Sequence, residues 1–159
     1  MFAEFSYKPF FVLLSTSYVI TEATISTPSE DFTDATVNMK ADMNTIDTDN
    51  EKRDAHLKAV DFFDTSKFPD LTFQSTSFKK TGTDKYIITG NLTTHGITKS
   101  ISLNASVKSG INPNNNKPIT GMKITGTIMR MDFDISKSAP EAVLSNAVEI
   151  EADLELGKE

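Results

Sequence analysis

The chain contains no cysteine, no tryptophan and only two histidines among its 159 residues. The missing cysteine excludes disulfides, thiolate nucleophiles and cysteine-bound zinc, but it assigns no compartment, because proteins without disulfides occur in all of them. The histidines, His56 and His95, lie far apart and form no H-E-x-x-H pair, so this zinc-peptidase motif is absent. Cysteine-based catalysis is therefore excluded, and the histidines do not form this zinc motif.

Positive charge and long apolar runs are also scarce. The formal net charge is -6, which argues against a nucleic-acid partner, since phosphates demand a basic surface. No stretch approaches the roughly 20 apolar residues of a membrane-spanning helix. Residues Phe10 to Leu14 are apolar, but Glu4 and Pro9 precede them and no small-x-small cleavage site follows. We therefore expect no signal peptide and favour a cytoplasmic location, with the periplasm as the alternative.

Motifs that carry catalysis are missing as well. There is no G-x-S-x-G elbow, no glycine-rich phosphate loop and no calcium-binding loop of the EF-hand type. With 22 Asp and Glu residues, some pair of carboxylates is always available, so a glycosidase-like pair has no specificity. We predict no catalytic residue, no metal and no cofactor. The enzymatic alternative is a hydrolase or isomerase that uses His95 or His56 beside a carboxylate.

What the sequence does have is a two-residue alternation of apolar and polar side chains, which is typical of half-buried strands. It is clearest near the C-terminus, where Val148, Ile150 and Ala152 alternate with acidic residues. About seven antiparallel strands predict a sandwich or a closed barrel, and periodicity alone does not choose between them. Other stretches with strand patterns cover residues 35–44, 71–78, 86–93, 100–107 and 122–129, in which Gly90, Ala105 and Gly126 are small residues that would leave volume in a lumen.

Only residues 51–63 break this rhythm, and they predict one short helix. Ala55, Leu57, Ala59, Val60 and Phe63 have helical spacing, and Asp49 or Asn50 is the expected N-cap. Turns are expected at residues 81–84 and 110–118, and an irregular segment at 136–146. Without linkers or repeats, we predict a single domain over residues 1–159, with residues 1–22 as an atypical N-terminal segment.

The polar residues of this helix have two interpretations. Arg53, Asp54 and His56 could belong to a metal or acid–base site, but the number of ligands is too small, so we interpret them as a structural motif that caps and anchors the helix. His95 precedes Gly96 at a strand end, and we assign it to the turn, with its ring nitrogen as a cap, rather than to a barrel mouth.

Three stretches resemble the signature motifs of one protein family and occur in the same order as in that family. The resemblance as a whole runs from about Ala23 to Leu156. The family is that of the YceI-like proteins, which are lipocalin-like. The stretches are Asn50-x-x-Arg53-Asp54-x-His56-Leu57-Lys58-x-x-Asp61-Phe62-Phe63-Asp64 with Phe68-Pro69-x-Leu71-x-Phe73-x-Ser75-Thr76, Gly90-Asn91-Leu92-Thr93-Thr94-His95-Gly96-Ile97-Thr98-Lys99, and Met129-Arg130-Met131-Asp132-Phe133.

The resemblance implies an all-β fold, a lipocalin-like antiparallel barrel of about eight strands with one short helix near residues 51–63. It also implies an apolar lumen for a long isoprenoid lipid, such as a polyprenyl chain or a prenylated quinone. A stress-related barrel filled by its own side chains is the competing interpretation, and the oligomeric state, a homodimer included, stays open. The expected lumen residues are Val37, Met39, Met43, Phe62, Phe63, Phe73, Ile88, Leu92, Leu103, Ile124, Ile128 and Phe133.

Two departures from the family pattern carry expectations of their own. The usual opening with a Trp and a His-Ser is missing, and residues 4–8 resemble a remnant of the first strand. We expect that strand to be shortened, re-registered or poorly ordered, which would weaken closure of the barrel. Asp134 stands where the family usually has Gly, and Asp tolerates a positive φ there at modest cost.

Overall fold

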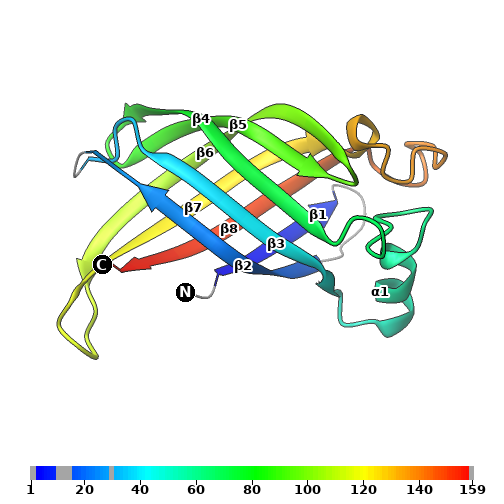
Figure 1. The fold of residues 1–159 in the computed structure, drawn as a ribbon, viewed down its shortest axis with the longest axis horizontal. Coiled ribbons are helices and arrows are strands. Elements are labelled where there is room, and N and C mark those ends of the chain that lie inside the picture. Colours follow the sequence, from blue (N-terminus) through cyan, green and yellow to red (C-terminus); the bar gives the residue numbers. More distant parts are fainter. Residues whose placement is uncertain (1–2, 10–15, 29–30, 158–159) are drawn as a thin grey trace.

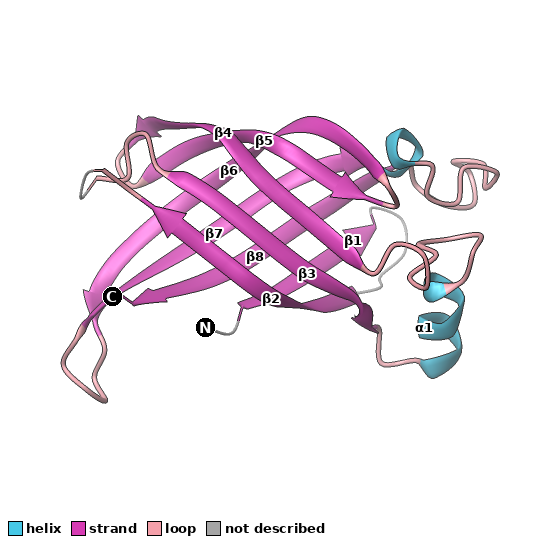
Figure 2. Cartoon of the chain, in the orientation of Figure 1, coloured by secondary structure: helices cyan, strands magenta, loops and turns pink. Residues whose placement is uncertain are grey.

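The computed structural model describes residues 3–9, 16–28 and 31–157, and these form a closed antiparallel β-barrel (Figures 1 and 2). Each strand pairs with its neighbours in sequence, and the last pairs with the first. The predicted lipocalin-like fold is thus confirmed. The strands are β1 (Ala3–Pro9), β2 (Thr16–Ser26), β3 (Thr36–Asp47), β4 (Asp70–Gly82), β5 (Lys85–Thr94), β6 (Ile97–Ile111), β7 (Pro118–Met129) and β8 (Ala147–Gly157).

Closure depends on β1, which the sequence left in doubt. Its backbone pairs with β2, from Ala3 opposite Ile20 to Tyr7 opposite Thr16, and with β8, from Glu4 opposite Asp153 to Pro9 opposite Val148. The predicted remnant at residues 4–8 is therefore a strand. Its described part spans 7 residues, and the residues on either side of it lie outside the described ranges, so the expected shortening stays a prediction. Pairing on both sides gives β1 the role of closing the ring of strands.

The alternation of side chains also holds. On β5, Tyr86, Ile88 and Leu92 are buried, whereas Lys85 and Asn91 are exposed. The same inward rows run along β3, β6, β7 and β8, so one apolar core fills the barrel. Burial of apolar surface stabilises the folded state by about 25 cal/mol for each Å² removed from water. Since such burial is the dominant favourable term in folding, this core is the main source of stability.

Two glycines on the strands correct one expectation. A Cβ on Gly90 would lie 2.5 Å from the ring of Phe73 and 2.5 Å from the carbonyl oxygen of Gln74, and a Cβ on Gly126 would overlap a methyl group of Leu103. The volume that these small residues were expected to leave to a lumen is therefore taken by Phe73 and Leu103. Large and small residues on facing positions interlock, as close packing requires.

The helix is shorter than predicted. α1 spans Glu51–Lys58, and the side chain of Asn50 caps it by accepting a hydrogen bond from the Arg53 backbone N–H at 3.1 Å. No residue of α1 is fully buried, and Val60 is 79% exposed, but Leu57 is partly buried and packs against the core. The apolar helix face predicted from the spacing is thus present only in part. The chain turns after Lys58, and Phe63 enters the core from this turn.

The two ends of the barrel carry different connections (Figure 1). At one end, here called the α1 end, lie α1, the residues that follow it up to β4, the 3-10 helix η1 (Arg130–Phe133) and the irregular segment 134–146. At the other, here called the hairpin end, lie the β4–β5 and β6–β7 turns and the β2–β3 connection. The β6–β7 loop is shorter than predicted. It covers residues 112–117, because β6 continues to Ile111 and β7 begins at Pro118.

Replacing these glycines should separate rigid packing from adjustable packing. Gly90→Ala should lower the free energy of unfolding by about 1–3 kcal/mol or more, because the backbone of Gln74 and Ser75 cannot move aside locally. Gly126→Ala should cost less, because only the end of the flexible Leu103 side chain must shift. Gly121→Ala, on an exposed position without a close neighbour, is the matched control and should be neutral or stabilising. Urea unfolding measures all three, and equal losses at Gly90 and Gly126 would contradict the packing described here.

Candidate functional site

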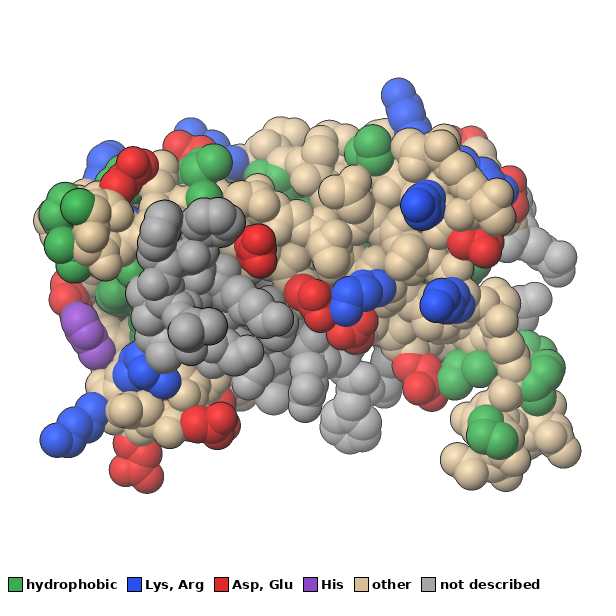
Figure 3. Space-filling model, turned by 180° about the vertical axis from the view of Figure 1, so that it is seen from behind, with side chains coloured by type: hydrophobic (Ala, Val, Ile, Leu, Met, Phe, Trp, Pro, Cys, Tyr) green, Lys and Arg blue, Asp and Glu red, His purple; other side chains and the backbone are tan. Residues whose placement is uncertain are grey.

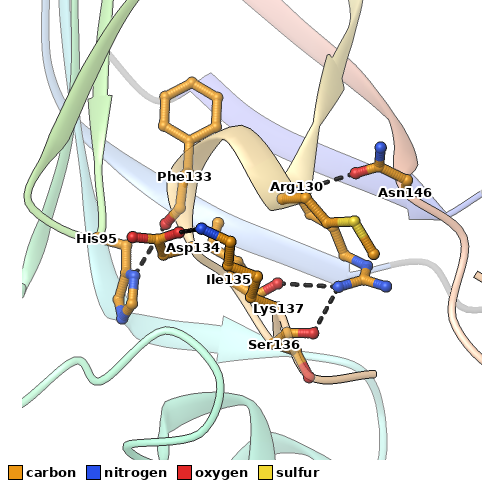
Figure 4. Close-up of polar contacts among 9 residues, drawn as sticks. His95, Arg130, Phe133, Asp134, Ile135, Ser136, Lys137 and Asn146 are labelled. Atoms are coloured by element: carbon orange, nitrogen blue, oxygen red, sulfur yellow. Dashed lines mark hydrogen bonds and ion pairs between the residues drawn. The ribbon is translucent and has the colours of Figure 1, made fainter. Parts of the chain in front are cut away.

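The α1 end is organised by a buried arginine that sequence reasoning assigned only to a family motif. Arg130, at the start of η1, is 1% exposed and directs its guanidinium at backbone carbonyls (Figure 4). A guanidinium has five N–H donors, and hydrogen bonds to charged donors are stronger than neutral ones. The accepting carbonyl oxygens are those of Ser145 at 2.9 Å, Ile135 at 3.1 Å, Ser136 at 2.6 Å, Ala139 at 2.7 Å and Leu144 at 2.8 Å.

These bonds determine the path of the irregular segment. Five carbonyls within residues 135–145 face one cation, so a stretch without regular ladders still has its backbone acceptors satisfied. Asn146 adds a second connection, because its side-chain oxygen accepts from the Met131 N–H at 3.0 Å (Figure 4). The signal available in the sequence was an arginine flanked by two methionines directly after an apolar strand.

His95 joins the β5–β6 turn to η1. Its Nδ1 lies 2.9 Å from the carbonyl oxygen of Phe133, and since a carbonyl only accepts, Nδ1 carries the proton (Figure 4). The ring packs edge-on against Phe68, with centroids 5.0 Å apart. Its φ of 51° confirms the turn position. The ring nitrogen bonds across to η1, however, instead of capping its own turn as predicted.

Asp134 follows η1 with φ 54° and ψ 19°, so the expected left-handed conformation is confirmed. Lys137 donates to its Oδ1 at 2.6 Å (Figure 4), and this hydrogen bond lowers the pKa of the Asp134 carboxyl below its ordinary value. Both side chains are exposed, so the pair orders the turn and contributes little to stability.

The Arg53–Asp54 pair anchors α1 to the end of β3, as predicted. Arg53 donates from Nε to the Thr48 hydroxyl at 2.8 Å and from Nη2 to the Thr48 carbonyl at 2.7 Å. Asp54 accepts from the Thr48 N–H at 2.9 Å and from the Thr48 hydroxyl. Both charged groups thus serve one buried threonine, which agrees with a structural role.

His56 faces solvent. Its Nε2 lies 2.9 Å from Asp61 Oδ2, with exposed side-chain fractions of 63% and 68%, and this hydrogen bond lowers the pKa of the Asp61 carboxyl. The enzymatic alternative needs a histidine inside the barrel beside a carboxylate. Over the described residues neither histidine meets this condition, and no cluster of three or more His, Asp or Glu residues suited to a metal was found.

The twelve expected lumen residues are all buried. Their exposed fractions lie between 0% for Val37 and Ile88 and 9% for Phe62. A side chain that lines a water-filled cavity keeps accessible surface toward it, and these residues keep almost none. All twelve thus belong to the buried core, and their place in a ligand-binding lumen stays a prediction.

One hollow lies on the outside of the barrel. It measures about 740 Å³ and runs over β6, β7 and β8, with Gly110 and Gly121 among its lining residues. Lys123 lies within it and pairs with Glu151 at 2.7 Å and with Asp153 at 3.6 Å. Where side chains are coloured by type in Figure 3, acidic and basic ones lie interspersed. Among the helices of the described segments, none is long and apolar enough to cross a bilayer.

Comparison with known proteins agrees with the sequence motifs. The model of the family described as "YceI-like domain" matches residues 3–156. A UPF0312 protein from Pectobacterium atrosepticum is 42% identical over 110 residues, which are 69% of this chain and 54% of that protein. The chain thus spans about half the length of the curated relatives it matches.

Solved structures show the same fold. BcnA from Burkholderia cenocepacia superposes with a TM-score of 0.84 at 18% identity, covering 97% of this chain and 96% of that one. A polyisoprenoid binding domain from Saccharophagus degradans superposes with a TM-score of 0.63 at 12% identity, covering 99% and 94%. At these identities the likeness concerns the fold alone. The family model matches nearly the whole chain, and the structure is the barrel that the solved relatives share. This chain therefore belongs to the YceI-like family.

Proposed function

We propose that this protein binds a long isoprenoid chain inside its barrel and performs no chemistry on it. The observation that carries the proposal is the interior itself, a cluster of buried apolar side chains that includes residues of every strand from β3 to β8. Membership of the YceI-like family supports it, as does the likeness to a polyisoprenoid binding domain.

The chemistry of such a ligand matches the chemistry of the interior. An isoprenoid tail presents only methyl groups, methylenes and double bonds, so its recognition needs burial and shape instead of ionised groups. At about 25 cal/mol for each Å² of buried apolar surface, a long tail gains affinity without any catalytic side chain.

The filled interior determines how the tail would enter. Because Phe73 and Leu103 occupy the space beside Gly90 and Gly126, binding requires side chains to move. Three buried methionines, Met39, Met43 and Met122, are unbranched and adjust their rotamers at low cost. In this proposal the tail replaces contacts that these side chains make with one another.

The same burial favours a second candidate, a barrel that is filled permanently by its own side chains and acts through its surface. The two candidates differ in a simple observable. A carrier holds lipid when it is isolated from cells that make isoprenoids, and a self-filled barrel does not.

Native mass spectrometry of the full chain, purified from a quinone-producing host, should therefore show a bound species of lipid mass, with about one lipid per chain. Organic extraction of the same sample should release an isoprenoid. Protein that is entirely free of lipid under these conditions would support the self-filled barrel and contradict the carrier.

Bulky substitutions inside the barrel should block uptake. Leu103→Trp places a larger side chain against Gly126, and Ile124→Trp places one in the inward row of β7. Each should occupy space that the lipid needs and reduce bound lipid several-fold. Asn104→Trp, at the next, exposed position of β6, is the matched control and should bind like the wild type. Circular dichroism monitors the fold. Unchanged uptake in both inward variants, with the fold intact, would show that the lipid is not held in the interior.

A further inference from the structure

One buried hydroxyl at the α1 end has no role in the fold described above. Thr94 is the last residue of β5 and ends the inward row formed by Tyr86, Ile88, Gly90 and Leu92. It is 1% exposed. Across the part of the chain that the structure describes, its Oγ1 is the buried side-chain atom without a hydrogen-bond partner.

Other buried polar side chains at this end are engaged. The Thr48 hydroxyl bonds to Asp54, the Ser145 hydroxyl donates to the Ala147 carbonyl at 3.0 Å, and Arg130 is bound to carbonyls. Burying a hydroxyl without a partner is unfavourable, and folded proteins seldom tolerate it without a reason. Valine has nearly the same shape and would fill the same space without this cost.

The inward row of β5 has a hydroxyl at each end, and only one is used. At the hairpin end, the Tyr86 hydroxyl donates to the Asp31 carbonyl and is thereby occupied. At the α1 end, the Thr94 hydroxyl remains able to donate. Between them the row is apolar, with Ile88 0% and Leu92 1% exposed.

This arrangement fits a ligand that is apolar along its length and carries a hydrogen-bond acceptor at one end. We propose that Thr94 Oγ1 donates a hydrogen bond to the oxygen-bearing end of the bound lipid, so that a carbonyl-bearing isoprenoid lies with its oxygen at the α1 end and its tail toward the hairpin end. This inference rests on the proposed function and adds the class of ligand and its direction.

The test compares a quinone with a pure hydrocarbon. The purified full chain is incubated with phosphatidylcholine vesicles that contain either a ubiquinone with a short prenyl tail or squalene, and the lipid bound to the re-isolated protein is measured. Thr94→Val should weaken quinone uptake about tenfold, the effect of one lost hydrogen bond, and leave squalene uptake unchanged. Thr94→Ser should restore quinone uptake.

A matched control lies one residue away. Thr93→Val removes a hydroxyl from the outward face of the same strand, where it bonds to the Thr98 hydroxyl at 2.8 Å, and should take up both lipids like the wild type. Infrared spectroscopy adds a direct readout, because the carbonyl band of the bound quinone should lie at lower frequency in the wild type and in Thr94→Ser than in Thr94→Val.

Stability separates a free hydroxyl from one that is already satisfied. Without added lipid, Thr94→Val should melt at the same temperature as the wild type or higher. A clearly lower Tm would show that the hydroxyl has a partner within the folded protein and would overturn the inference. Wild-type protein that takes up neither lipid would refute the proposed function, and with it the inference. Uptake of both lipids with no quinone-specific loss in Thr94→Val would refute the role of Thr94 alone.

Discussion

The architecture of the α1 end depends on the guanidinium of Arg130. A cation buried without a carboxylate is unfavourable unless hydrogen bonds replace its hydration, and here five backbone carbonyls do so. The same bonds fix the backbone of residues 135–145, a segment that contains no strand or α-helix. They hold η1 in place, and η1 in turn offers the Phe133 carbonyl to His95. Hydrogen bonds thus link the segment that precedes β8, through η1, to the β5–β6 turn.

Much of the fold could be predicted from the sequence, because period-two alternation reports directly which side chains are buried. Ile88 and Ala152, both assigned to inward rows, are 0% exposed. Alternation did not decide between a sandwich and a barrel, since both have one apolar face; the family resemblance decided it. The N-capping of α1 by Asn50 and the anchoring by Arg53 and Asp54 were also predictable, because caps depend on a few neighbouring residues.

The remaining features depend on contacts distant in sequence. Helical spacing from Ala55 to Phe63 did not reveal that α1 ends at Lys58. The chain turns there, and Phe62 and Phe63 are buried in the core after the turn instead of continuing the helix. The spaces beside Gly90 and Gly126 could not be assigned, since their occupants, Phe73 and Leu103, stand on neighbouring strands. The buried network of Arg130 and the unpartnered hydroxyl of Thr94 were missed for the same reason. A sequence does not show whether a polar group will find hydrogen-bond partners, because those partners come from other parts of the chain.

The order of the strands has a consequence for how the chain reaches this structure. Seven of the eight ladders join strands that follow one another along the chain, whereas β1 and β8 come from its opposite ends. Contacts between distant residues carry a larger loop-closure entropy than local ones. We therefore expect the meander from β2 to β8 to assemble hairpin by hairpin, and the pairing of Glu4 with Asp153 and their neighbours to form last. Destabilisation of this ladder should show itself mainly as faster unfolding, with little change in the folding rate.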